Sequence, residues 1–206
     1  MPARWGDRRR ARIGLLGGSF NPAHAGHRHV ADHALRALRL DEVWLMVSPG
    51  NPLKPKRGMA PFPERLASAR RLAGGRVLAT DIEARLGTRY TVETLALLRR
   101  RFPLARFVLL VGADIPTQFP RWKRWQPMLR HTPLAVLPRP GETRRALAGQ
   151  AIHRLAPWRR RPAGLLAGPD MPHARWCLIP AREHPASATA IRAALARQNS
   201  MPRRQP

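Results

Sequence analysis

Short apolar runs alternate with amphipathic helical patterns along most of this chain. Six runs have the length and composition of buried parallel strands, in residues 13–16, 42–47, 76–82, 107–111, 134–137 and 174–179. Elsewhere apolar residues recur at helical spacing, in residues 30–38, 62–72, 91–101 and 188–196, and a short helix is expected to end at Arg130. This alternation predicts an α/β protein with a doubly wound, mostly parallel sheet and helices on both faces.

The patterned part of the chain is expected to form one domain. A chain of 206 residues is long enough to bury a core of its own, and we assign that domain to residues 13–197. Residues 1–12 are expected to be a loose basic leader, and the polar residues 198–206 a frayed tail. Residues 142–172 show little periodicity, so we expect a variable helix and loop region there and assign it no function.

A glycine turn and two histidines meet at the first joint between strand and helix, in the sequence GGSFNPAHAGH of residues 17–27. Gly17 and Gly18 let backbone N–H groups approach an anion, and the start of the following helix adds unpaired donors. His24 and His27 share one face of the first helical turn, from which imidazoles can donate hydrogen bonds to a phosphate. We interpret this joint as a nucleotide phosphate site.

Two other nucleotide-binding motifs do not fit this joint. The spacing of Gly14, Gly17 and Gly18 does not fit G-x-G-x-x-G, and no G-x-x-x-x-G-K-[ST] string occurs in the sequence. These mismatches disfavour a dinucleotide fingerprint and a P-loop. Considered alone, the two histidines are also compatible with a glycine turn followed by surface histidines.

A second candidate phosphate site opens the last predicted helix. Ser187 is a natural N-cap, because its hydroxyl can accept a hydrogen bond from an unpaired backbone N–H. Thr189 and Arg192 lie three residues apart on one helical face, and arginine can bind phosphate oxygens bidentately. This turn suits the outer phosphates of a nucleotide, although an ordinary capped amphipathic helix has the same pattern.

The two motifs together resemble the nucleotidyltransferase superfamily that transfers adenylyl or cytidylyl groups. Residues 17–27 are similar to its G-G-[ST]-F-[DN]-P-x-H-x-G-H signature, and residues 187–192 to its [ST]-[ST/A]-T-x-[IL]-R signature. The resemblance implies a Rossmann-like nucleotidyltransferase fold in which His24, His27 and Arg192 are catalytic. It also implies an ATP site made by Gly17, Gly18, Ser19, Phe20, His24, His27, Asp114, Ser187, Thr189 and Arg192.

Three further segments resemble bacterial nicotinate-nucleotide adenylyltransferases. Residues 88–95 are similar to S-Y-T-x-x-T-L, residues 112–114 match G-x-D, and residues 119–122 fit F-x-x-W. The resemblance implies a mononucleotide site made by Tyr90, Thr91 and Trp122 and, by a looser match in the Pro-rich loop 48–56, by Asn51 and Lys54. Considered singly, Trp122 also fits a buried anchor, Asp114 a helix cap and Tyr90 a core residue.

The reaction that the resemblance implies is adenylyl transfer from ATP to nicotinate mononucleotide, which gives deamido-NAD and pyrophosphate in NAD biosynthesis. Mg²⁺ would accompany ATP, and we expect no metal site made of protein ligands. Two alternatives stay open. The acceptor could instead be nicotinamide mononucleotide or phosphopantetheine, or the chain could be a basic nucleic-acid-binding protein on the same fold.

Charge and cysteine content bear on partners and compartment. The chain has 38 Lys and Arg against 12 Asp and Glu, a net charge of +26, but the arginines are spread along it, so we expect no specific nucleic-acid partner. Cys177 is the single cysteine, which fits a reducing cytoplasm. Since no apolar run approaches the roughly 18 residues of a membrane span, we expect a cytoplasmic protein without a membrane partner. The sequence contains no signal for a particular oligomeric state.

Overall fold

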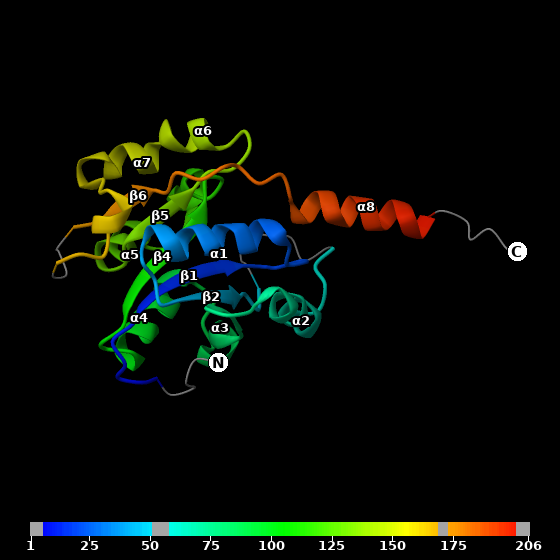
Figure 1. Cartoon of the computed structure of the whole chain (residues 1–206), viewed down its shortest axis with the longest axis horizontal. Coiled ribbons are helices and arrows are strands. Elements are labelled where there is room, and N and C mark those ends of the chain that lie inside the picture. Colours follow the sequence, from blue (N-terminus) through cyan, green and yellow to red (C-terminus); the bar gives the residue numbers. More distant parts are fainter. Residues whose placement is uncertain (1–5, 51–57, 169–172, 201–206) are drawn as a thin grey trace, which may run out of the picture.

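A parallel sheet forms the centre of the molecule. The computed structural model describes residues 6–50, 58–168 and 173–200. In that part of the chain the strands are β1 (Arg12–Gly18), β2 (Glu42–Val47), β3 (Val77–Thr80), β4 (Arg106–Gly112), β5 (Leu134–Leu137) and β6 (Trp176–Leu178). They pair in the order β3-β2-β1-β4-β5-β6, and every pairing is parallel (Figure 1). The six predicted strands and the predicted parallel sheet are confirmed.

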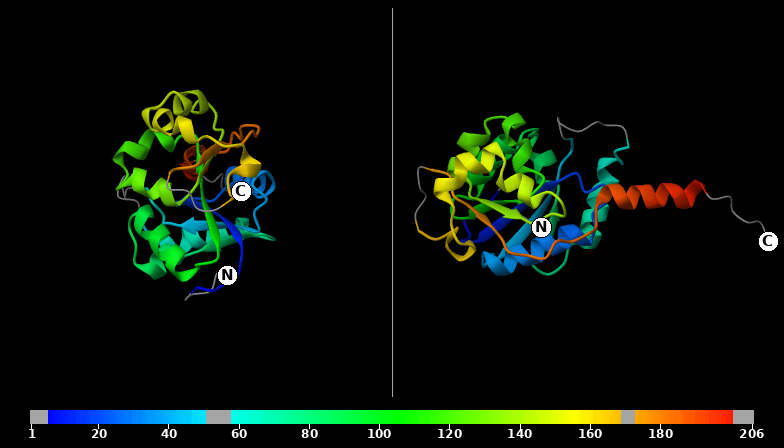
Figure 2. Two further views of the ribbon diagram at one scale, coloured as in Figure 1. Left: turned by 90° about the vertical axis from the view of Figure 1, so that its left-hand side faces the viewer. Right: turned by 90° about the horizontal axis from the view of Figure 1, so that it is seen from above.

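Helices cover both faces of the sheet, as predicted (Figures 1 and 2). One face packs against α1 (Ala25–Ala37) and α2 (Phe62–Leu72). The opposite face packs against α3 (Ile82–Leu86), α4 (Thr91–Arg101), the 3₁₀ helix η1 (Pro116–Arg121), α5 (Trp125–His131), α6 (Thr143–Leu147) and α7 (Gln150–Leu155). After α7 the chain returns to β6 through the 3₁₀ helices η2 (Ala156–Trp158) and η3 (Pro162–Gly164), and then ends in α8 (Ala188–Ser200).

The alternation of side chains along β1 explains the two cores. Ile13 and Leu15 belong to the core beneath α4, whereas Leu16 belongs to the core beneath α1. Ile13 and Leu15 are fully buried and Leu16 is 6% exposed, so this central strand is covered on both faces. Such a strand holds the loop that follows it in a defined position.

The strand order places a crevice at the carboxyl end of β1. The chain leaves β1 for β2 on one side and later returns to β4 on the other side. In an open parallel sheet, the connections leave in opposite directions at this point, and ligands bind between them. Gly17 and Gly18, predicted to form a turn, are instead the last residues of β1, where they pair with β2. The loop that leads to the histidines follows β1, and Asp114 follows β4, so the fold brings two predicted site segments to the same crevice.

Helix α3 and the 3₁₀ helix η1 were not predicted. The predicted strand 76–82 ends at Thr80, and α3 begins at Ile82, so the assignment of Ile82 to a strand is wrong. Gly87, with φ of 65°, ends α3 in the left-handed conformation that glycine adopts without strain. A five-residue helix is too short to show a helical period in the sequence.

The ends of the chain differ in two details from the prediction. Arg12 is the first residue of β1, and the Arg9 guanidinium donates hydrogen bonds to both carboxylate oxygens of Glu42, at 2.6 and 3.1 Å. The last helix runs to Ser200, beyond its predicted end at Ala196. Residues 1–5 and 201–206 lie outside the described residues. Within the described ranges, no helix has the length and apolar character of a membrane span.

Candidate active site

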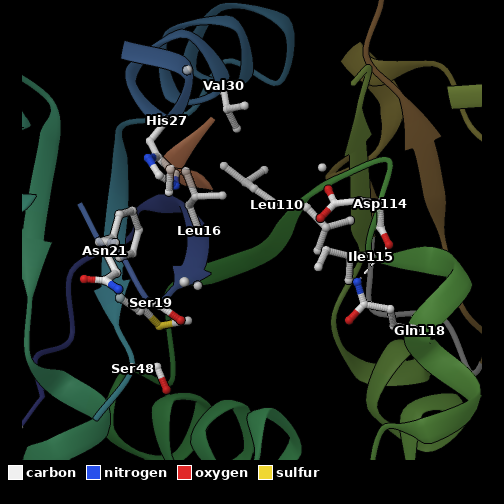
Figure 3. Close-up of a pocket in the computed structure, with 18 of the residues that line it drawn as sticks. Leu16, Ser19, Asn21, His27, Val30, Ser48, Leu110, Asp114, Ile115 and Gln118 are labelled. Carbon is white, nitrogen blue, oxygen red and sulfur yellow. Dashed lines mark hydrogen bonds between the residues drawn. The ribbon is translucent and has the colours of Figure 1, made fainter. Parts of the chain in front are cut away.

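A cavity of about 590 Å³ opens at the carboxyl ends of the central strands. The predicted site residues that line it are Gly17, Gly18, Ser19, Phe20, His24, His27, Tyr90, Thr91, Asp114, Trp122, Ser187, Thr189 and Arg192. Figure 3 shows Ser19 and His27 on one side of this cavity and Asp114 on the other. Asn51 and Lys54 lie outside the described residues. The structure therefore brings together segments from both ends of the chain.

The loop after β1 is held in one shape by the side chain of Asn21. Its amide donates a hydrogen bond to the carbonyl of Gly58 at 2.9 Å, and its Oδ1 accepts one from the N–H of Ala60 at 3.2 Å. Phe20, with φ of 48°, is in the left-handed region, and its ring is only 2% exposed. These contacts fix the backbone between the glycines and the histidines.

Arg65 of α2 connects the loop after β1 with the segment after β2 and with the residues just before α2. Its guanidinium donates hydrogen bonds to the carbonyls of Ser19 (2.8 Å), Ser48 (2.7 Å) and Ala60 (3.0 Å). The residue is 3% exposed, and burial lowers the pKa of its guanidinium, which stays charged at neutral pH. The sequence analysis assigned Arg65 no role, because one arginine in a helical pattern has the signature of a solvated position.

Replacing Arg65 by methionine is expected to lower the free energy of unfolding by about 2–4 kcal/mol, since three partly buried carbonyls lose a charged donor. Because the loop after β1 then loses an anchor, the affinity of the predicted ATP site for ATP should fall as well. Urea unfolding and ATP calorimetry measure the two effects. The matched control is Arg70→Met, at an exposed position of the same helix, which should leave both quantities unchanged. Equal effects of the two substitutions would contradict a clamping role for Arg65.

The two histidines form a contacting pair at the start of α1. His24 is the N-cap residue and His27 lies in the first turn, with 3.9 Å between the ring centroids. The backbone N–H of His24 donates a hydrogen bond to Nδ1 of His27 at 3.2 Å. Because Nδ1 is the acceptor, the neutral ring of His27 carries its proton on Nε2. His27 therefore presents a hydrogen-bond donor at a helix N-terminus, where an anion is favoured.

His24 is the more buried of the two rings. It is 7% exposed, and its Nδ1 has no hydrogen-bond partner among the described residues. Burial, together with smaller contributions from the charges of Arg139 and His184, lowers the pKa of His24 to about 4. His24 is therefore neutral at physiological pH in the absence of an anion.

Acid is expected to destabilise the protein through His24. As the pH falls, the unfolded chain binds a proton near pH 6.5, whereas the folded ring binds one only near pH 4. The contribution of neutral His24 to the free energy of unfolding is complete above pH 6.5. It falls by about 1–3 kcal/mol as the pH decreases toward 4. Urea unfolding at pH 7 and at pH 4.5 measures this loss. Between these pH values the free energy of unfolding of His24→Asn should decrease by about 1–3 kcal/mol less than that of the wild type. Equal losses in the two proteins would contradict the assignment.

The last helix returns to the histidine loop. Oγ of Ser187 accepts the N–H of Ala190 at 3.1 Å, so the predicted N-cap is confirmed. Nη1 of Arg192 donates to the carbonyl of Asn21 at 2.6 Å, and Nη2 donates to Oγ1 of Thr189 at 3.3 Å. The two motifs, separated by most of the sequence, thus meet through a direct hydrogen bond.

Asp114 and Arg139 form an ion pair on the opposite side of the cavity, with 3.3 Å between Arg139 Nε and Asp114 Oδ1. A Cβ at Gly112 would lie 2.6 Å from Asp114 Oδ1 and 2.9 Å from Arg139 Nε, so glycine leaves room for this pair. Sequence reasoning missed Arg139. It could have been found from its position just after β5, since side chains that follow parallel strands gather at one edge.

Aromatic side chains from two elements meet in one part of the cavity lining, which we call its aromatic end. Tyr90, the N-cap of α4, is 39% exposed, so it is not a core residue. Trp122 packs edge-on against the buried ring of Phe119, with 5.2 Å between the ring centroids. Lys123 joins these elements, because its Nζ lies 4.3 Å from the Tyr90 ring centroid and 2.7 Å from Oε1 of Glu93.

Four charged side chains at this aromatic end were also missed by sequence reasoning. Arg89, Arg121 and Lys123 line the cavity beside Tyr90 and Trp122, and Glu83 lines it from α3. The three cations are direct sequence neighbours of residues in the recognised segments, which is the signal that could have found them. No comparable signal marked Glu83, because the short helix that carries it was not predicted.

The comparisons with known proteins agree with this geometry. The sequence matches the family described as cytidylyltransferase-like over residues 15–194. A protein of Gluconacetobacter diazotrophicus named "Probable nicotinate-nucleotide adenylyltransferase" is 57% identical over 201 residues, which cover 96% of this chain and 93% of the relative. A protein of the same name from Gluconobacter oxydans is 58% identical over 184 residues, covering 88% of this chain and 93% of the relative.

A solved structure supports the fold. The structure of nicotinic acid mononucleotide adenylyltransferase of Plasmodium falciparum complexed with NaAD superposes with a TM-score of 0.65 over 89% of this chain and 83% of that chain, at 15% identity. Likeness at this identity concerns the fold alone. The family match and the relatives above 50% identity assign the chain to the cytidylyltransferase-like nucleotidyltransferases and, among them, to the nicotinate-nucleotide adenylyltransferase family.

Proposed function

We propose that this protein transfers the adenylyl group of ATP to nicotinate mononucleotide, forming deamido-NAD and pyrophosphate. The observation that carries the proposal is the 2.6 Å hydrogen bond from Arg192 to the carbonyl of Asn21. It joins the histidine loop and the start of α8 around one cavity, whose lining also carries aromatic rings and cations. One half of this cavity suits a triphosphate and the other suits an acidic pyridine nucleotide.

The triphosphate side offers donors of several kinds. The N-terminus of α1 and the Nε2 proton of His27 suit the α-phosphate, where negative charge has to be stabilised during transfer. Thr189, Arg192 and the capped start of α8 suit the β- and γ-phosphates, since arginine can bind two phosphate oxygens at once. Gly17, Gly18 and Ser19 line the cavity where backbone and nucleotide can approach closely.

The acceptor side suits a ring that carries a carboxylate. The indole of Trp122 and the phenol of Tyr90 provide faces for an electron-poor pyridine. Arg89, Arg121 and Lys123 give this end a positive potential, which favours the nicotinate carboxylate over the neutral amide of nicotinamide. Asn51 and Lys54 of the Pro-rich loop are assigned to the same acceptor, by resemblance alone.

The reaction needs little covalent help from the protein. The acceptor phosphate already carries most of its second negative charge at neutral pH, so no general base is required to make it a nucleophile. Holding the two substrates side by side removes the entropic cost of bringing them together. Donors around the α-phosphate and the leaving pyrophosphate then stabilise the charge that develops as the acceptor oxygen bonds to phosphorus and the bond to the β-phosphate breaks.

We propose that Mg²⁺ enters with ATP. Within the described residues, no group of three or more His, Cys, Asp or Glu side chains is arranged for a metal ion. Asp114 is engaged by Arg139, at 3.3 Å. A magnesium ion held by triphosphate oxygens and water fits such a cavity, and it would neutralise part of the phosphate charge.

The test is pyrophosphate release from ATP with each acceptor in turn. Nicotinate mononucleotide should support turnover at least about tenfold more efficiently than nicotinamide mononucleotide, which corresponds to one favourable charge contact of about 1.4 kcal/mol. Phosphopantetheine should support none. A preference for either of the other acceptors would overturn the proposal, as would tight, steeply salt-dependent nucleic-acid binding by a protein that releases no pyrophosphate.

A further inference from the structure

An acidic side chain lies in a cavity that otherwise suits anions. Among the described residues that line it, the acids are Glu83 and Asp114, and Asp114 is paired with Arg139. Glu83 lies on α3, which follows the carboxyl end of β3 and precedes the segment that carries Tyr90 and Thr91. A half-buried carboxylate at this place has to be stabilised by specific contacts.

One of those contacts is the hydroxyl of Thr94 on the next helix, α4. Oγ1 of Thr94 donates a hydrogen bond to Oε1 of Glu83 at 3.3 Å, and it lies 2.8 Å from Oγ1 of Thr88. Thr94 is fully buried and Thr88 is 7% exposed, so these hydroxyls have little access to water. The backbone carbonyl of Glu83 also accepts the N–H of Thr88 at 3.2 Å. Glu83 therefore holds both ends of the segment from which Tyr90 reaches the cavity.

The same carboxyl also lies against the loop after β2. Burial raises the pKa of Glu83, while hydrogen bonds with Thr94 and Ser48 act in the opposite direction and favour the ionised form. Ser48 itself is clamped by Arg65 through its carbonyl, at 2.7 Å. Glu83 thus links the segment after β2, helix α3 and the first turns of α4.

We propose that Glu83 is a positioning residue for the acceptor nucleotide. Its carboxylate, through the hydroxyl of Thr94, sets the place of Tyr90 and Thr91 at the start of α4, and it does so without contacting ATP. The inference rests on the proposed function in one respect, namely that this end of the cavity holds the acceptor. It concerns the geometry of that end, so it applies to whichever mononucleotide the wild type uses.

The test compares acceptor KM, ATP KM and kcat in four variants of the full chain. Glu83→Ala and Thr94→Val each remove one partner of the hydrogen bond, and each should raise the KM of the acceptor about tenfold, the effect of losing one bond to a charged group. The KM of ATP should stay within about twofold. Glu83→Gln and Thr94→Ser keep a partner in place, so they should restore the acceptor KM to near the wild-type value.

The double variant Glu83→Ala/Thr94→Val should be no worse than either single variant, because both changes break the same contact. The inference is overturned if acceptor KM is unchanged, if both KM values rise together, or if the two single effects multiply. Thr94→Val preserves the volume of the side chain, so its thermal unfolding midpoint should stay close to that of the wild type. If Glu83→Ala fails to fold, the acceptor KM of the folded Thr94→Val variant decides the inference. If the wild type releases no pyrophosphate with any mononucleotide, the proposed function fails instead.

Discussion

Replacing His27 by alanine is expected to lower kcat by about two to three orders of magnitude, the usual effect of removing one donor to charge that develops in a transition state. Nδ1 of His27 accepts the backbone N–H of His24, so Nε2 carries the proton of the neutral ring, and His27 lines the cavity. Since that charge develops only during transfer, the Kd of ATP should change by no more than about threefold. Steady-state kinetics and ATP calorimetry separate the two quantities.

The control for His27 lies on the same helix. His33 is on α1 and contacts the ring of His29, with 4.3 Å between the centroids, but it does not line the cavity. His33→Ala should keep kcat near the wild-type value. His27→Gln places an amide N–H near the position of Nε2 and should recover part of the lost rate. If His27→Ala instead loses stability in urea in proportion to its loss of rate, the residue is structural.

Replacing Arg192 by alanine is expected to lower kcat/KM for ATP by about two to three orders of magnitude, because the site loses a bidentate partner for phosphate oxygens. The same change removes the 2.6 Å bond to Asn21, so the start of α8 also loses its tie to the histidine loop. Arg192→Lys keeps the charge without the planar fork and should recover only part of the loss. The measurement is the rate of pyrophosphate release at varied ATP.

The matched control is Arg197→Ala, farther along α8, where the guanidinium donates to the carbonyl of Ala193 at 3.3 Å. This variant changes the net charge by the same amount, and Arg197 is not among the residues that line the cavity. Its kcat/KM should stay near the wild-type value. Equal losses in the Arg192 and Arg197 variants would mean that the general positive charge of the protein, and not the placed guanidinium, attracts ATP.

The strands and long helices were predictable because each repeats a burial pattern over several residues. The apolar run 107–111 lies within β4, and the predicted helices 62–72 and 91–101 have the bounds of α2 and α4. The short helix α3 was missed because five residues do not complete two helical turns. The hydrophobic pattern of the sequence therefore predicts the strands and helices that are long enough to repeat it.

Some residues of the site were predictable from local sequence motifs, and others were not. The two phosphate motifs are local strings, and their meeting through Arg192 and Asn21 follows from a fold that returns the chain to the crevice beside β1. Arg65 and Glu83 act through partners from other elements, such as Ser19 for Arg65. No spacing along the sequence records such contacts, so an arginine or glutamate of this kind resembles any solvated helix residue.

The central claim is that the adenylyl group of ATP moves to the mononucleotide. The most direct measurement uses ATP labelled with radioactive phosphorus at either the α or the γ position, together with nicotinate mononucleotide. The α label should appear in the dinucleotide product and the γ label in pyrophosphate, and both should depend on the acceptor. Release of the α label as AMP without acceptor, or transfer of the γ label to the mononucleotide, would contradict the account.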